Sequence, residues 1–184
     1  MTTPLAVTVR GMLLRELAAM TRMIELYPDD ASVWREAAGV PNRGGTLVLH
    51  CCGNLRHYVG GQIGGSGYAR DRDAEFTRRG VPRDELLRLI GVTADEVDRA
   101  LADVRDSDLD GDFPEIVAGQ RIAARELLMH VCSHLAYHLG QLDYHRRFVT
   151  GDPRGAGAMQ AAELPSARPA TSVSTPLSSV RRPG

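Results

Sequence analysis

The chain lacks lysine and has few aromatic side chains, and both shortages exclude functions. All 22 basic residues among its 184 residues are arginine. Without lysine, the chain can form no Schiff base with a carbonyl compound and no phosphate-binding P-loop. Aromatic residues make up 5% of the chain and apolar residues 43%, so aliphatic side chains must fill most of the core. The use of arginine alone also points to a GC-rich coding genome.

Long apolar runs, a leader sequence and a charge imbalance are missing as well. No stretch approaches the roughly 18 apolar residues that would suggest a membrane span. The first residues, Met1-Thr-Thr-Pro4, contain no basic region followed by an apolar one, so we expect no secretory signal. The net charge of −1 gives no reason to expect nucleic acid or an anionic membrane as a partner. We therefore expect a cytoplasmic protein without a nucleic-acid or membrane partner.

Cysteine is also scarce. The three cysteines, Cys51, Cys52 and Cys132, do not make a disulfide framework. An odd number without a secretory signal fits a reducing cytoplasm. We interpret each of them as a small buried residue rather than as a nucleophile.

Helical periodicity recurs in four segments, and no convincing strand pattern appears. Apolar residues at steps of three and four predict helices over about 8–26, 46–63, 82–104 and 123–148. Thr46 is a reasonable N-cap of the second helix, and Gly91-Val-Thr93 indicates a break in the third. Four long helices predict an all-α fold, a four-helix bundle.

The composition changes after residue 150. Residues 151–184 are rich in proline, glycine, serine and alanine and contain no aromatic residue. Such a stretch buries too little apolar area to offset the entropy lost on ordering it. We predict a bundle domain over 1–150 and a disordered tail over 151–184, with a short helical turn near 158–163. The composition of the tail also fits a linker or a segment that recruits a partner.

The fourth predicted helix carries a polar stripe among leucines. Its members recur at steps of four, four, three and four: His130, His134, His138, Gln141 and His145. Residues four apart lie on nearly the same face of a helix, about 6 Å apart, so two imidazoles at that spacing can hold one metal ion. A histidine in the second predicted helix, His50, could complete the site. The pattern alone leaves the metal interpretation open, because it cannot show that the two helices adjoin.

Longer motifs resemble a known family. The segment His134-Leu-Ala-Tyr-His138-Leu-Gly-Gln141 resembles the signature helix of the DinB/YfiT-like superfamily, and His50 fits the same pattern. The stretches His50-Cys-Cys-Gly-Asn54-Leu-Arg56 and Arg70-Asp-Arg-Asp-Ala-Glu-Phe76 resemble more narrowly its DUF1572 branch, where similar motifs occur in the same order. The resemblance covers roughly residues 8–150. It implies an up-down-down-up bundle with a mononuclear divalent metal site of three histidines.

Carried over by position, the resemblance implies His50, His134 and His138 as the metal ligands, with zinc or nickel as the expected metal. Three protein nitrogens leave coordination positions open for water or substrate, as in catalytic rather than closed structural sites. Asn54 and Gln141 lie on the histidine faces and are expected to support the ligands or to line a pocket.

The remaining histidines receive lesser roles. We interpret His130 as a spare ligand or a polar residue of the core, with support of the ligands as the alternative. His57 is about 10 Å along the helix from His50 and is expected to line the pocket or the surface. His145 is expected to be supporting or incidental. In Arg70–Phe76, we prefer mutual pairing of arginine and aspartate at a helix end or subunit contact over substrate binding.

The expected function follows from the family likeness. Characterised relatives of the superfamily include transferases that join a low-molecular-weight thiol to an electrophile, and a GC-rich genome favours mycothiol as that thiol. Metal-dependent hydrolysis is the alternative among enzymes. A non-catalytic metal-binding or stress protein is the alternative outside them, because the sequence offers no conspicuous carboxylate beside the ligands to act as a general base. A homodimer formed through the bundle helices is compatible with this fold, although no sequence feature indicates one.

Overall fold

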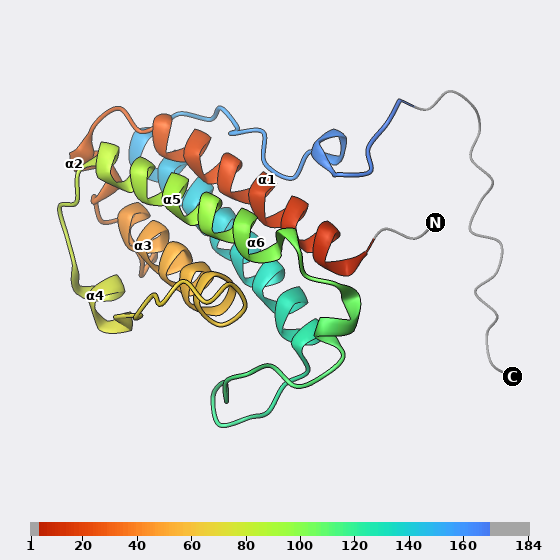
Figure 1. Ribbon diagram of the computed structural model, residues 1–184. Coiled ribbons are helices and arrows are strands. Elements are labelled where there is room, and N and C mark those ends of the chain that lie inside the picture. The colour runs from red at the N-terminus through yellow and green to blue at the C-terminus, as the bar shows by residue number, and fades with distance from the viewer. Residues whose placement is uncertain (1–3, 170–184) are drawn as a thin grey trace, which may run out of the picture.

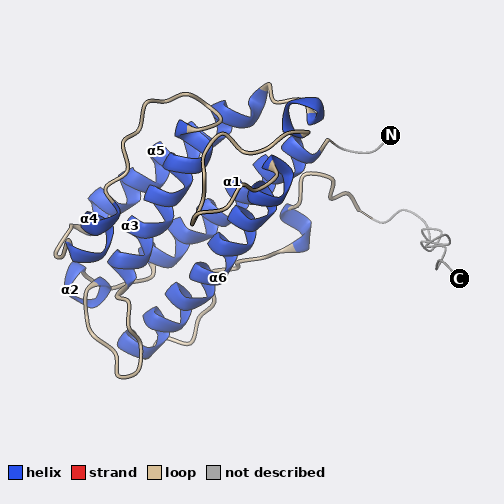
Figure 2. Ribbon diagram, turned by 90° about the horizontal axis from the view of Figure 1, so that it is seen from below, coloured by secondary structure: helices blue, strands red, loops and turns tan. Residues whose placement is uncertain are grey.

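The computed structural model describes residues 4–169, and this part of the chain is a bundle of four long helices (Figure 1). The long helices are α1 (Leu5–Glu25), α3 (Gly44–Leu55), α5 (Arg83–Ala102) and α6 (Ala124–Thr150). The short helices are α2 (Asp30–Val33), α4 (Arg72–Thr77), a π-helix that continues α3 (Arg56–Gly61) and two 3-10 helices (Asp106–Leu109 and Ala161–Glu163). Between residues 4 and 169 there are helices and loops but no strand (Figure 2). The all-α prediction is confirmed.

The order of the helices in space is that of an up-down-down-up bundle. Helices α1 and α6 run in one direction and α3 and α5 in the other (Figure 1). Helix α1 packs against α5 and α6, and α3 packs against the same two helices. The long connection between α3 and α5 includes α4, which lies against α3. This connection lets two consecutive long helices run parallel, and it places α4 beside the face that α3 turns toward α6.

Aliphatic side chains fill the core, as the low aromatic content predicted. Fully buried examples from the three longest helices are Leu13, Leu17, Ile24, Leu86, Ile90, Leu101, Leu135, Leu139 and Leu142. Each such side chain contributes about 1.5–3 kcal/mol when it is removed from water. Beside this core, His134 and His138 of α6 lie against His50 of α3. Within residues 4–169, no helix is long and apolar enough to cross a membrane.

Two predicted features of the helices are wrong. Thr46 is not an N-cap, because α3 begins at Gly44 and Thr46 is buried inside the first turn. A Cβ at Gly45 would stand 2.2 Å from the ring of Trp34. The glycine therefore lets the indole pack against the first turn of α3. The predicted break at Gly91–Thr93 is absent, since α5 is continuous and the Thr93 hydroxyl donates a hydrogen bond of 2.8 Å to the Leu89 carbonyl.

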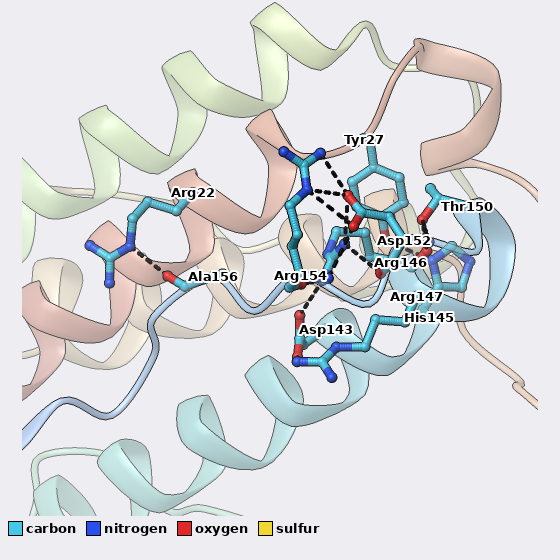
Figure 3. A network of polar contacts seen from close by, with 10 residues as sticks. All are labelled: Arg22, Tyr27, Asp143, His145, Arg146, Arg147, Thr150, Asp152, Arg154 and Ala156. Atoms are coloured by element: carbon cyan, nitrogen blue, oxygen red, sulfur yellow. Dashed lines mark hydrogen bonds and ion pairs between the residues drawn. The ribbon is translucent and has the colours of Figure 1, made fainter.

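The first part of the predicted tail contacts the bundle, which its composition did not indicate. The side chain of Arg146 is fully buried, pairs with Asp143 at 3.0 Å and donates to the carbonyl oxygens of Asp152 and Arg154 (Figure 3). Arg22 of α1 donates to the carbonyl oxygen of Ala156 at 2.7 Å. A buried guanidinium that donates to backbone carbonyls can hold a segment that has few apolar side chains. The prediction of disorder for residues 170–184 lies outside the described residues.

Candidate metal centre

Three histidines from α3 and α6 meet at one point between the two helices. The Nε2 atom of His134 lies 3.3 Å from Nε2 of His50 and 3.2 Å from Nε2 of His138. One ligand atom from each of the three residues falls within 4.8 Å of the other two. Two imidazole nitrogens bound to one tetrahedral zinc ion at about 2.0–2.1 Å stand roughly 3.3 Å apart. The spacing of the three nitrogens therefore fits a mononuclear site.

The ring of His50 is oriented by a carboxylate from α4. Its Nδ1 lies 2.9 Å from Oε2 of Glu75, which is itself buried. Arg70 donates to both oxygens of the same carboxylate, at 2.7 and 2.9 Å. Because a carboxylate only accepts hydrogen bonds, the proton of neutral His50 lies on Nδ1 and the lone pair of Nε2 faces the other two histidines. This arrangement of carboxylate, histidine and open ligand position is typical of metal sites in proteins.

Glycine on α3 allows this carboxylate to approach. A Cβ placed on Gly53 would lie 2.0 Å from Oε1 of Glu75, a distance that no side chain can tolerate. The glycine of the His50-Cys-Cys-Gly53 motif is thus explained by the close contact between α3 and Glu75.

Gln141 does for His138 what Glu75 does for His50. Nδ1 of His138 lies 2.7 Å from Oε1 of Gln141, one turn further along α6. The amide oxygen accepts the proton of Nδ1, so the Nε2 lone pair of His138 also faces the centre. Gln141 therefore lies beside a histidine of the cluster.

The protonation of the site suits a cation. Burial and the neighbouring His138 and His50 lower the pKa of His134 to about 4. Burial also lowers the pKa of His138. Burial raises the pKa of the Glu75 carboxyl, but the hydrogen bonds from Arg70 and His50 outweigh it and bring that pKa below its usual value. At neutral pH the His134 and His138 imidazoles are thus uncharged and the Glu75 carboxylate is ionised, which is the state that metal binding requires.

The structure corrects the expectation that no carboxylate lies near the histidines. Residues 72–77 form the short helix α4 rather than a loop, and the Asp71 side chain caps it by accepting from the Ala74 amide at 2.9 Å. Helix α4 places Glu75 against His50, which lies 25 positions earlier in the chain. The prediction for this motif was pairing of arginine with aspartate. In the structure Arg70 pairs instead with Glu75, which also holds a histidine of the cluster.

The other candidate residues lie outside the cluster of three. His130 is exposed on α6, with its ring centroid 6.1 Å from that of His134, so its interpretation as a core residue is wrong. His57 lies in the π-helix, where its Nε2 is 2.7 Å from a carboxylate oxygen of Glu115. Asn54 is buried on α3, one turn after His50. None of the three is part of the group of ligand atoms that converge.

His145 has a structural role. It is buried, its Nδ1 lies 2.7 Å from the Tyr27 hydroxyl and its Nε2 lies 2.9 Å from the Arg35 carbonyl oxygen (Figure 3 labels Tyr27 and His145). Because a carbonyl only accepts, Nε2 carries the proton and Nδ1 accepts from the tyrosine. Burial lowers the pKa of His145. Its imidazole therefore joins the loop after α1 to α6 in the neutral form.

The lowered pKa of His145 predicts a pH dependence of stability. In the unfolded chain the pKa is about 6.5, so below that pH the unfolded state binds a proton that the folded state resists. Stability from this group is complete above about pH 6.5 and is lost as the pH falls toward the lower, folded-state pKa. Urea unfolding of the metal-free protein should give a free energy of unfolding that falls from pH 7.5 to pH 5, and less steeply in His145→Gln. Equal slopes in the two proteins would contradict this assignment.

The cysteines are buried, as the sequence indicated. Cys51, Cys52 and Cys132 are free thiols with almost no exposed surface. Burial raises the pKa of the Cys52 thiol to about 12 and that of Cys132 to about 11, and it also raises the pKa of Cys51. Because the thiolate is the reactive and metal-binding form, these side chains act as core residues rather than as nucleophiles or ligands.

Comparisons with known proteins agree with the geometry. Residues 8–151 match the family model described as mycothiol-S-transferase. This range contains all but the first three residues of α1, the other three long helices and all three clustered histidines, and it ends one residue after α6. No curated protein and no solved structure matched the chain.

Proposed function

The chain belongs to the mycothiol-S-transferase family, a DinB/YfiT-like family, and from this premise we propose that it is a metal-dependent transferase that joins a low-molecular-weight thiol to an electrophile. The observation that carries the proposal is the convergence of three histidines: Nε2 of His134 lies 3.3 Å from that of His50 and 3.2 Å from that of His138. Hydrogen-bond acceptors lie behind the rings of His50 and His138. The printed name of the family is the reason for proposing mycothiol as the thiol. The narrower likeness to the DUF1572 branch, the cytoplasmic location and a homodimer stay predictions.

We propose His50, His134 and His138 as the ligands of one divalent metal ion. Imidazole suits zinc and nickel among the common divalent metals. When bound, such an ion would lower the pKa of a thiol at its open position and so supply a thiolate at neutral pH. Side chains of the protein orient the ligands for this role. Glu75 accepts the Nδ1 proton of His50, and Gln141 accepts that of His138. Arg70 keeps the Glu75 carboxylate ionised and in place.

The proposed reaction is a substitution and consumes no oxidant or reductant. With an aryl chloride, the thiol sulfur forms a bond to the ring carbon, the carbon–chlorine bond breaks and chloride leaves with the bonding electron pair. The thiol proton is released to solvent. Half-buried His134 and His138 lie at the exposed side of the cluster while His50 is buried behind them, so the two substrates would approach from the side of α6.

A conjugation assay tests this proposal. Zinc- or nickel-reconstituted protein should convert mycothiol and 1-chloro-2,4-dinitrobenzene to the thioether, measured by absorbance, and His138→Ala should lower the rate at least about 100-fold. His130→Ala changes an exposed histidine one turn from the cluster and should keep most of the activity. Metal-loaded protein that forms no conjugate with mycothiol, bacillithiol or glutathione would refute the transferase and favour a non-catalytic metal protein. Hydrolysis of an ester without any conjugation would favour a hydrolase.

A further inference from the structure

A cavity of about 210 Å³ opens beside the histidine cluster, between the loop at residues 39–42 and helices α3 and α6. Its walls include Val40, Pro41 and Asn42 from the loop, Leu47 from α3, and Gln141 and Tyr144 from α6. The loop reaches this position because buried His145 of α6 holds the Arg35 carbonyl, which lies just before it. No role has yet been assigned to this space.

The cavity adjoins the proposed metal centre on both helices. Leu47 precedes His50 by three residues on α3, and Gln141 follows His138 by three residues on α6, so each lies about 4.5 Å along its helix from a ligand. Gln141 belongs to both places, since its Oε1 accepts from His138 while its side chain forms part of the cavity wall. A molecule in the cavity would thus lie about one helical turn from the point where the three histidines converge.

The chemistry of the walls selects a neutral ligand. No charged side chain lines the cavity, and its largest walls are aliphatic or aromatic. The polar side chains in its lining are Asn42, Gln141, Tyr144 and His145. Both ring nitrogens of His145 are already paired with Tyr27 and Arg35, which leaves the two amides and the Tyr144 hydroxyl for a ligand. Burying a charge without a partner is costly, whereas an apolar cavity of about 150 Å³ can hold benzene. This space therefore suits one substituted ring or a neutral compound of similar size.

We propose that this cavity binds the electrophile, as a neutral compound of about one ring whose polar substituent accepts a hydrogen bond from the Asn42 or Gln141 amide. The inference rests on the proposed transferase function and assigns the second substrate to a place in the fold. Reacting atoms must come within about 3–3.5 Å for the bond to form. The cavity lies about one helical turn from His50 and His138, so the reactive carbon of the ring must lie at the end of the cavity nearest these histidines. Asn42 and Val40 then determine which electrophiles fit.

Binding of an unreactive analogue tests the proposal without any turnover. Nitrobenzene is neutral, carries one polar group and has no leaving group, so it can be titrated into zinc-reconstituted protein and followed by NMR. The expected result is saturable shifts of the Asn42 and Gln141 side-chain amides and the Leu47 methyl groups. N-methylpyridinium, a cationic ring that does not coordinate zinc, should leave the same signals unchanged. Shifts that do not saturate, or that appear elsewhere, would overturn the proposal.

Variants that fill the cavity provide the second arm. Asn42→Trp should weaken nitrobenzene binding at least about 10-fold by occupying the space, and Val40→Phe should do the same if the first variant fails to fold. Gln62→Leu alters a separate cavity near Ile63 and Phe113 and should bind nitrobenzene as the unchanged protein does. Equal affinity in all four proteins would refute the assignment. Binding in the cavity by a protein that conjugates no thiol would retain the cavity and reject the transferase function, so the two failures are distinguishable.

Discussion

Replacing His138 by alanine should lower the metal content of the reconstituted protein from about one ion to below about 0.1 ion per chain. The variant leaves two of three converging nitrogens and removes the one that Gln141 orients. Because two imidazoles and water hold zinc far more weakly than three imidazoles do, the ion should be lost on dialysis. Elemental analysis of the dialysed protein measures the effect.

The matched control for this experiment is His130→Ala. His130 lies on the same helix, two turns before His138, but is exposed and does not belong to the converging group. It should keep about one ion per chain. Thermal unfolding of both metal-free variants checks that the helix is intact, since neither side chain belongs to the apolar core. Equal metal content in the two variants would contradict the assignment of His138.

Replacing Glu75 by glutamine should weaken zinc binding by about 10–100-fold, because groups that orient a ligand histidine typically contribute that much to affinity. The amide keeps the shape of the side chain but removes the negative charge. That charge strengthens the hydrogen bond from His50 and pairs with Arg70. Competition with a zinc chelator measures the dissociation constant. The substituted amide can turn either its oxygen or its NH2 group toward Nδ1, so the imidazole NMR signals of His50 should report both neutral tautomers instead of one.

Glu96→Gln is the control for the loss of an ion pair between a glutamate and an arginine. Glu96 accepts from Arg56 at 3.0 and 2.8 Å, much as Glu75 accepts from Arg70, but no hydrogen bond joins it to a histidine of the cluster. Both variants should destabilise the fold to a similar degree, and only Glu75→Gln should weaken zinc binding. A similar loss of zinc affinity in the two would show that the effect comes from general loosening of α3.

The sequence predicted the parts of the site that depend on local spacing. His134 and His138 stand one turn apart on a single helix, so any helix over 123–148 places them on one face. His50 could be added only through the family likeness, because nothing in its own helix indicates that α3 and α6 adjoin. In the folded chain, Nε2 of His134 lies within hydrogen-bond distance of Nε2 of both His50 and His138, and one ligand atom of each of the three residues lies within 4.8 Å of the other two.

Glu75 could not be found from the sequence, for a physical reason. Its partner His50 is 25 positions away, and the Arg-Asp-Arg-Asp pattern around it is equally suited to pairing within itself. The only trace of the contact was Gly53, whose missing side chain makes room for the carboxylate. A glycine inside a helix, three residues after a histidine, indicates that another group can approach the helix closely there.

Buried polar residues were the other class that the sequence analysis missed. His145 is tied to Tyr27 and Arg35, and Arg146 holds the carbonyls of Asp152 and Arg154 (Figure 3). The composition of a segment predicts how much apolar side-chain area it can bury, and the segment after residue 150 has few apolar side chains. Composition does not predict that the backbone carbonyls of this segment accept hydrogen bonds from a buried guanidinium of another element.

The central claim is that one divalent metal ion binds to three imidazoles between α3 and α6. X-ray absorption spectroscopy of zinc-reconstituted protein tests it most directly, because the spectrum reports the number and kind of ligand atoms. We predict about one zinc ion per chain with three imidazole nitrogens at about 2.0–2.1 Å, lighter atoms in the remaining position and no sulfur. Less than about 0.1 ion per chain, or a shell with sulfur at about 2.3 Å from Cys51, Cys52 or Cys132, would contradict it.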